Sequence, residues 1–245
     1  MMKMRKSLIV LASLLAFVLA KPAAAQWIYG AVSAGMNLTQ VDGDEEYGYK
    51  KFGFNGGPSV IKPFGKNRNW SVTMELLFSM KGSRQNSRYS PRQDTVPIVD
   101  TVSYYDGYKL NLDYVEIPLL VHYTDKKVIA AGVGFAYGQR VGYKEKEDRN
   151  DAYTFPPDGW QTMDSASTYS NYDLSVLADV KIRLWKRLWL NGRFSYSMVP
   201  IRERVFSVPA TPTDKVWTRE QYNNVITIRL TYVFNEPLPL KRNKQ

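Results

Sequence analysis

The chain has 245 residues, of which 44% are hydrophobic and 13% aromatic, and it contains no cysteine. These totals suit one sizeable domain or two small ones. Without cysteine the protein has no disulfide framework, no thiolate metal site and no cysteine nucleophile. The formal net charge is +10, but the basic residues do not gather in one tract, so we do not expect nucleic acid as a partner.

Residues 1–25 have the features of an export signal. A basic start at Lys3 to Lys6 precedes the apolar run Leu8 to Ala20, and Ala23 and Ala25 fit the small-residue pattern for cleavage. The run is shorter than the roughly 20 residues that a helix needs to span a bilayer. We therefore predict a cleaved signal peptide. Its four basic residues leave with it, so the net charge of the mature chain is +6.

After this segment, apolar and polar residues alternate with period two, which is typical of strands. In segment 172–184 the apolar side chains share one face and the polar ones the other, with Leu177 as the exception. Segments 70–81 and 226–234 repeat the pattern. These runs exceed the five or six residues of a common soluble strand and approach the roughly 9–11 of a strand that crosses a bilayer.

Eight candidate strands follow from this alternation: 27–38, 52–62, 70–82, 108–124, 127–141, 171–185, 188–199 and 217–234. The connections between them alternate in length. The second, fourth and sixth are short turns, whereas the first, third, fifth and seventh are long and polar. Short periplasmic turns and long extracellular loops are the organisation of a transmembrane barrel.

The sequence therefore predicts an all-β protein, an eight-stranded antiparallel transmembrane β-barrel of up-and-down meander order. It would cover residues 26–235 and precede a short periplasmic tail at 236–245. In lipid every backbone polar group must be paired, and closing the sheet achieves this. The apolar faces Val115 to Val121 and Ile129 to Phe135 would then meet lipid. Pro118 lacks a ladder donor, so we expect a bulge or local distortion there.

Four stretches carry a resemblance to a known family: GMNLTQVDGD (35–44), FGFNGGPSV (52–60), YVEIPLLVHY (114–123) followed by AAGVGFAYG (130–138), and ITIRLTYVF (226–234). Together they resemble the PorT-like outer-membrane β-barrel family of Bacteroidetes-type bacteria. The resemblance implies an eight-stranded barrel in the outer membrane of a Gram-negative bacterium. The family's namesake takes part in protein secretion, but most relatives have no assigned activity, so that role does not carry over.

The interior of an eight-stranded barrel is just wide enough for side chains to fill it, so inward charges should pair in a packed network. Lys81 faces inward by alternation, and the predicted network consists of Glu75, Glu116, His122, Asp179, Lys181, Arg183, Arg193 and Arg229. If Trp185 to Arg187 form the turn, Asp179 lies opposite Arg193, and we expect a cross-strand ion pair there.

The sequence offers no arrangement for catalysis or for a cofactor or metal. His122 is the only histidine, and no nucleophile motif accompanies it. We consider a proton-sensitive latch at His122 but favour a structural hydrogen bond. Glu75 and Glu116 as a glycosidase pair are disfavoured, because a filled lumen offers a sugar no cleft.

Five aromatic residues fall near predicted periplasmic strand ends, where they would form a girdle at the headgroup level: Trp27, Trp70, Tyr123, Trp185 and Trp189. The long fifth connection carries Tyr153, Phe155 and Trp160. Such residues suit an extracellular recognition surface and, equally, an ordered lid on the barrel.

We therefore expect a non-enzymatic, monomeric barrel with a structural or interaction role. Its partners would be outer-membrane lipid and a protein bound by the extracellular loops. The alternatives are a narrow channel or secretion-system accessory and, less favoured, an enzyme at the membrane rim. The position of His122 near the periplasmic end leaves no histidine for a site on the outer rim.

Overall fold

The structure, a computed structural model, describes residues 28–44, 48–85, 89–91, 103–105, 107–148, 160–163, 169–208 and 215–237. Its long strands are β1 (Tyr29–Asp42), β2 (Lys51–Phe64), β3 (Trp70–Glu75), β4 (Leu77–Gln85), β7 (Gly107–Asp125), β8 (Ile129–Asp148), β10 (Tyr172–Trp185), β11 (Leu188–Ser197) and β13 (Lys215–Val233). Shorter strands are β5 (Tyr89–Pro91), β6 (Ser103–Tyr105), β9 (Trp160–Met163) and β12 (Arg202–Val208).

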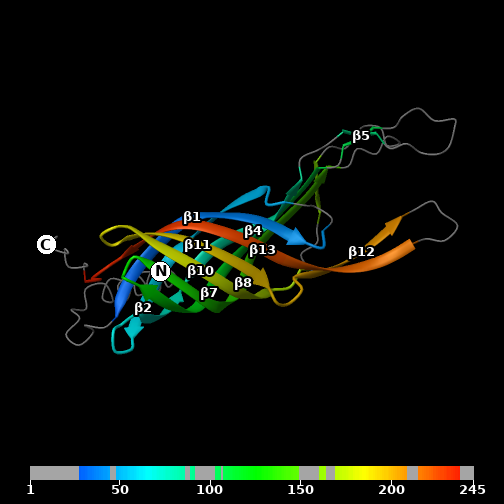
Figure 1. The fold of residues 1–245 in the computed structure, drawn as a ribbon. Helices are drawn as coiled ribbons and strands as arrows, with labels where there is room; N and C mark the ends of the chain where they lie inside the picture. Colours follow the sequence, from blue (N-terminus) through cyan, green and yellow to red (C-terminus); the bar gives the residue numbers. More distant parts are fainter. Residues whose placement is uncertain are drawn as a thin grey trace, which may run out of the picture.

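The long strands close into a ring (Figure 1). β1 pairs with β2 on one side and with β13 on the other, and the circle continues through β3 and β4, β7, β8, β10 and β11 back to β13. Every pair is antiparallel, and β3 and β4 follow one another along a single line of the sheet. The ring thus has eight strand positions, which confirms the predicted fold.

The break between β3 and β4 falls at Leu76, between two prolines on the neighbouring strands. The register shared by β3 and β4 places Pro118 of β7 opposite Glu75, the residue before the break. On the other side, Pro58 of β2 accepts a hydrogen bond from the Leu76 N–H at 3.0 Å. A proline cannot donate to the ladder. The expected distortion therefore appears on the strand facing Pro118, and the pairing register is the same before and after it. The bulge of β7 itself lies between Asp113 and Tyr114.

Side chains alternate between a polar interior and an apolar exterior. Along β10, exposed and buried residues alternate without a break from Tyr172 to Ile182. Outward residues include Val133 and Phe135, 65% and 63% exposed, while Arg229 points inward at 2%. This is the reverse of a soluble sandwich and fits a barrel surrounded by lipid. Leu177, the exception in the sequence pattern, packs inside against Leu120 and Ala136.

Within the described part of the chain, no helix is long and apolar enough to cross a membrane.

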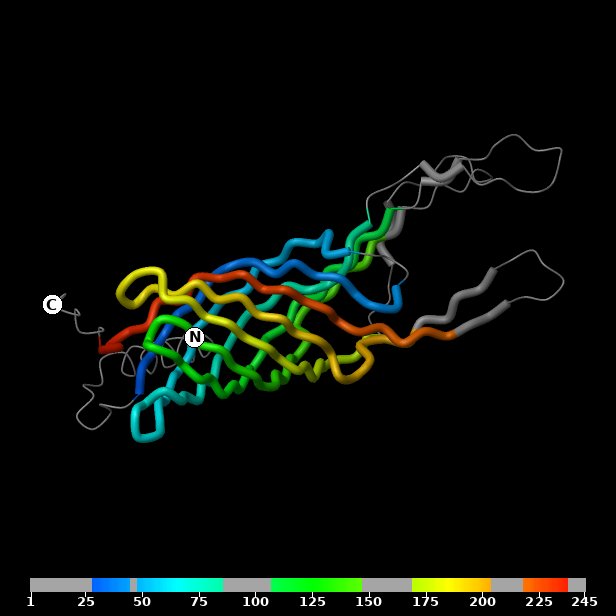
Figure 2. The backbone as a smooth tube through the Cα atoms, in the orientation of Figure 1, coloured from blue at the N-terminus to red at the C-terminus, as the bar shows by residue number. Residues whose placement is uncertain are grey.

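The two ends of the barrel differ. Three short turns, between β2 and β3, β7 and β8, and β10 and β11, lie together at one end, which we call the turn end (Figure 2). The opposite end, from which β12 and the far part of β13 project (Figure 1), is called the loop end.

At the loop end the strands run farther than the alternation predicted. β8 continues to Asp148 in register with β7, beyond the expected end at residue 141. β12 lies in the expected loop 200–216 and pairs with β13. Strand ends that leave the membrane need no lipid-facing apolar side, so their sequences lack the period-two signal. The predicted signal peptide 1–25 and residues 238–245 of the predicted tail lie outside the described residues, and these domain boundaries stay predictions.

A matched pair of variants tests the lipid-facing surface. Val133→Arg places a charge in the middle of the apolar band of β8, whereas Val128→Arg places it in the turn before β8, where Val128 is 47% exposed. We expect the first to lower the free energy of unfolding by about 2–4 kcal/mol and the second by at most about 1 kcal/mol. Urea titration in phospholipid vesicles measures both, and equal losses would contradict the membrane position of β8.

Candidate functional site

Glu75 of β3 lies at the centre of the polar interior. Its carboxylate accepts hydrogen bonds from Arg193 of β11 at 2.8 and 3.1 Å and from Arg229 of β13 at 2.9 and 3.0 Å. Arg229 also donates to Asn191 at 2.5 Å and to Asn55 at 3.2 Å. The three charged side chains are nearly inaccessible. Two guanidinium groups on one carboxylate offset much of the desolvation that burial imposes.

Asp179 of β10 joins this cluster as the sequence predicted. Asp179 and Arg193 are register partners, and an Arg193 nitrogen donates to Asp179 Oδ2 at 2.8 Å. Asn191 donates to the other carboxylate oxygen. The predicted cross-strand ion pair is therefore present, and with it the register between β10 and β11.

His122 of β7 bridges Thr73 and Asp179. One ring nitrogen lies 3.2 Å from Thr73 Oγ1, and the other lies 3.1 Å from Asp179 Oδ2. A hydroxyl, a histidine and an aspartate in this order make up a hydrolytic triad, and no sequence motif indicated it. Here, however, Asp179 also holds Arg193 and Asn191, and the Thr73 side chain is only 1% exposed. The line of contacts serves to fix the histidine inside the network.

Toward the loop end, Lys81 of β4 holds two carboxylates. Its ammonium nitrogen lies 2.6 Å from Glu116 Oε1 and 3.0 Å from Asp173 Oδ2, and 5.2 Å from the centre of the Tyr114 ring. Asn223 donates to Asp173 at 3.0 Å. Asp173 was not predicted as a network member, although it shares the inward face of β10 with Asp179, six residues later.

The eight charges of these two clusters balance in number but not in place. Toward the turn end, Glu75 and Asp179 meet the three cations Arg193, Arg229 and Lys181. Toward the loop end, Glu116 and Asp173 share the single cation Lys81. The turn-end half thus has one positive charge in excess. Lys181 has the weakest contact of these cations, 4.0 Å from Asp179 Oδ2.

Arg183 and Trp189 depart from their predicted places. Arg183 does not join the central network but binds Glu236, the first residue of the predicted tail, at 2.6 Å at the turn end. Trp189 is only 6% exposed, so it does not belong to the outer girdle. Its indole N–H donates to Glu236 at 3.2 Å, and its ring lies 4.2 Å below the Arg183 guanidinium. Trp189 lies four residues before the inward residue Arg193 on β11, so the alternation of side chains places both on the inner face.

The loop end of the lumen is packed with apolar side chains. Leu110 and Leu112 of β7, together with Ile201, are 0% exposed and form a cluster with Val41, Tyr108, Tyr114 and Tyr169. Beside it, Glu145 accepts hydrogen bonds from Tyr108 at 2.7 Å and Arg202 at 2.9 Å. Burial and the nearby Glu145 carboxylate raise the pKa of Tyr169 to about 12, so its phenol stays protonated. This packing was not predicted from the sequence.

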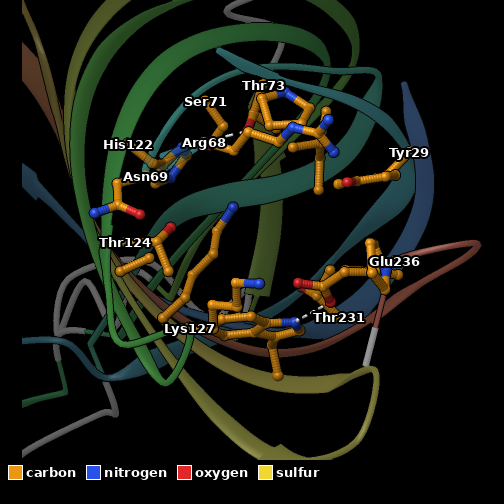
Figure 3. A pocket seen from close by; sticks show the side chains of 17 residues that line it. Tyr29, Arg68, Asn69, Ser71, Thr73, His122, Thr124, Lys127, Thr231 and Glu236 are labelled. Atoms are coloured by element: carbon orange, nitrogen blue, oxygen red, sulfur yellow. Dashed lines mark hydrogen bonds between the residues drawn. The ribbon is translucent and has the colours of Figure 1, made fainter. Parts of the chain in front are cut away.

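The turn end has a pocket of about 130 Å³ (Figure 3). Its inner part is lined by Thr73, His122 and Lys181, and its rim by residues of two turns, including Arg68 and Lys127. Trp189 and Val233 add apolar wall, and Glu236 lies on the same rim. The predicted residues His122 and Lys181 therefore lie together at this pocket, whereas Glu116 lies in the half toward the loop end.

A family model described as outer membrane protein beta-barrel domain matches residues 26–202, well over half of the chain. The chain belongs to this family. It is an outer-membrane β-barrel of a Gram-negative bacterium.

Solved outer-membrane barrels have a similar architecture at low identity. Ail of Yersinia pestis is 12% identical with a TM-score of 0.42, and the match covers 84% of this chain and 98% of Ail. Neisserial surface protein A is 10% identical with a TM-score of 0.40, covering 85% of this chain and 97% of that one. The outer membrane protease OmpT of Escherichia coli is 10% identical with a TM-score of 0.40, covering 85% and 94%. No curated protein matches the sequence.

Three residues predicted for the girdle of this outer-membrane barrel point outward at the turn end. Trp70, Tyr123 and Trp185 are 47%, 43% and 65% exposed. Trp70 and Tyr123 are register partners whose ring centres lie 5.1 Å apart, and the Lys186 ammonium lies 4.6 Å from the Trp185 ring centre. The fifth predicted member, Trp27, lies outside the described residues.

The Lys81 cluster yields a test of the network. Lys81→Met leaves Glu116 and Asp173 buried without their cation. We therefore expect the free energy of unfolding to fall by about 3–5 kcal/mol. The triple variant Lys81→Met, Glu116→Gln, Asp173→Asn removes the charges together and should recover most of that loss. Urea unfolding followed by tryptophan fluorescence measures the difference. Equal stability of the single and triple variants would mean that the cluster does not depend on charge pairing.

Proposed function

We propose that this outer-membrane barrel is a non-enzymatic, non-conducting and monomeric scaffold that presents its loop-end strands to a protein partner outside the cell. The observation that carries the proposal is the apolar packing of Leu110, Leu112 and Ile201, each 0% exposed, across the loop end of the lumen. A continuous apolar layer packed in this way would exclude water.

The distribution of charge supports a filled lumen. A conducting pore keeps its charged groups hydrated and its path continuous. Here the central charges are engaged with one another, and Glu75, Asp179 and Arg229 are 4%, 2% and 2% exposed. An eight-stranded barrel is also about the size at which side chains alone fill the interior. A narrow channel, or an accessory barrel of a secretion system, is the alternative.

The enzymatic alternative has one observation in its favour, the contact line from Thr73 through His122 to Asp179. A hydrolase would also need donors aimed at a developing oxyanion and a hydroxyl that a substrate can reach. Thr73 is 1% exposed, and Asp179 is held by Arg193 as well. The contact line fits a structural role better.

An interaction role is supported by the strands that extend beyond the barrel. β12 and the far part of β13 pair outside the ring and project from the loop end (Figure 1). Glu203, Arg219 and Glu220 are exposed on this hairpin. Short turns face the periplasm in such barrels, which would place the hairpin outside the cell. A closer relation to the PorT-like barrels is part of the same proposal.

Planar-bilayer recording tests the closed lumen. The purified protein should give no steady current. The double variant Leu110→Ala, Leu112→Ala should remain folded, as judged by the mobility difference of unboiled and boiled samples, and should admit a measurable current because it removes the apolar packing. A steady current from the unmodified protein, changed by substitution of a lumen charge, would establish a channel instead.

Photo-crosslinking on intact cells tests the interaction role. A photoreactive residue at the exposed position Glu203 should yield one discrete adduct with an external or outer-membrane protein. The same residue at Lys66, in the turn between β2 and β3, is the matched control and should not yield that adduct. If position 203 yields no adduct, or if both positions yield the same one, the hairpin is not a partner surface.

A further inference from the structure

We propose that the turn-end pocket binds a small organic carboxylate that carries a short apolar group. This inference concerns the periplasmic side of the protein and goes beyond the proposed loop-end function. It follows from the excess charge, the rim and the wall of the pocket (Figure 3).

Lys181 supplies the charge inside the pocket. Lys181 is 8% exposed, and its ammonium nitrogen lies 4.0 Å from Asp179 Oδ2. The ammonium group donates no hydrogen bond within the described residues, and Lys181 lines the pocket. An ammonium group has three N–H donors. Buried charges in proteins are normally paired and hydrogen-bonded. The Lys181 ammonium is an exception, because it lacks a close partner on the side that faces the pocket.

One negative charge would complete the turn-end half of the lumen. Glu75 and Asp179 there face three cations, Arg193, Arg229 and Lys181. A monoanion beside Lys181 brings the sum of these buried charges to zero. The apolar wall of Trp189, Ile61 and Val233 favours an organic carboxylate over inorganic phosphate.

The rim adds further cations and the wall adds apolar surface. Arg68 and Lys127 line the pocket from two different turns. The rim carboxylate of Glu236 is already bound by Arg183 at 2.6 Å and by the Trp189 indole at 3.2 Å, so it does not neutralise Lys181. The wall of Trp189, Ile61 and Val233 suits a short hydrocarbon group. The Arg183 and Trp189 contacts also show that this end of the barrel can hold a carboxylate.

The probe is 4,4,4-trifluorobutyrate, followed by fluorine NMR as it is titrated into the mature protein in detergent micelles. We expect saturable binding that weakens as salt is added, because an exposed rim contributes to it. The alcohol 4,4,4-trifluorobutanol has the same apolar group without the charge and should bind at least about tenfold more weakly. Inorganic phosphate should compete poorly.

Two adjacent lysines provide a matched control. Lys126 and Lys127 are both exposed and both have positive φ, 47° and 57°, so substitutions meet the same backbone conformation. Only Lys127 lines the pocket. We expect Lys127→Gln to weaken binding severalfold and Lys126→Gln to leave it within about twofold. Lys181→Met should weaken it by about tenfold or more; its folding is checked by heat-dependent gel mobility.

Three results would overturn the proposal. The first is the absence of saturable trifluorobutyrate binding to the unmodified protein. The second is equal binding of the alcohol, which would mean an apolar pocket without anion recognition. The third is an equal effect of Lys126→Gln and Lys127→Gln, which would mean diffuse attraction to the basic turns. The last two decide the matter even if Lys181→Met does not fold.

Discussion

The structure depends on the requirement that every backbone N–H and C=O in the membrane be paired within the protein. Closure through the pairing of β1 with β13 meets this requirement for the first and last strands of the ring. Closure also determines which side chains face lipid and which face the interior. Outward positions must be apolar, and inward positions collect the polar residues that a soluble protein would place on its surface. Even the two prolines beside Leu76 are accommodated without a change of register, because a shift would turn polar residues toward lipid.

In the middle of the ring, long-range pairing of polar residues takes the place of an apolar core. Glu75 and Arg229 are 154 positions apart in the chain, and Glu75 and Arg193 are 118 apart. Such contacts can form only when the sheet has closed in the correct register. The network is thus a consequence of closure and also a selector of register, since a slipped strand would leave buried charges unpaired. A buried ion pair does not by itself guarantee net stability, and specificity is its better attested role.

Period-two alternation made the strands and the Asp179–Arg193 pair predictable from the sequence. The same rule also placed Trp189 on the inward face of Arg193, yet the preference of tryptophan for membrane interfaces favoured the girdle, and that prediction was wrong. Arg183 was correctly placed on an inward face, but its partner Glu236 comes from beyond the last strand, where alternation gives no information. The apolar cluster of Leu110, Leu112 and Ile201 joins segments that the sequence assigned to a strand and a loop, so only the fold could bring it together.

The two ends of the lumen differ in the side chains that line them, and this asymmetry bears on where a ligand can bind. At the loop end apolar side chains meet across the barrel, and the Glu145–Arg202 ion pair beside them is buried. At the turn end the charges run to the edge of a pocket, and Lys181 has only a distant carboxylate. If the loop end is closed as proposed, a ligand reaches the polar interior from the turn end. The network around Glu75 and Lys81 lies between these two ends and joins strands from all around the ring.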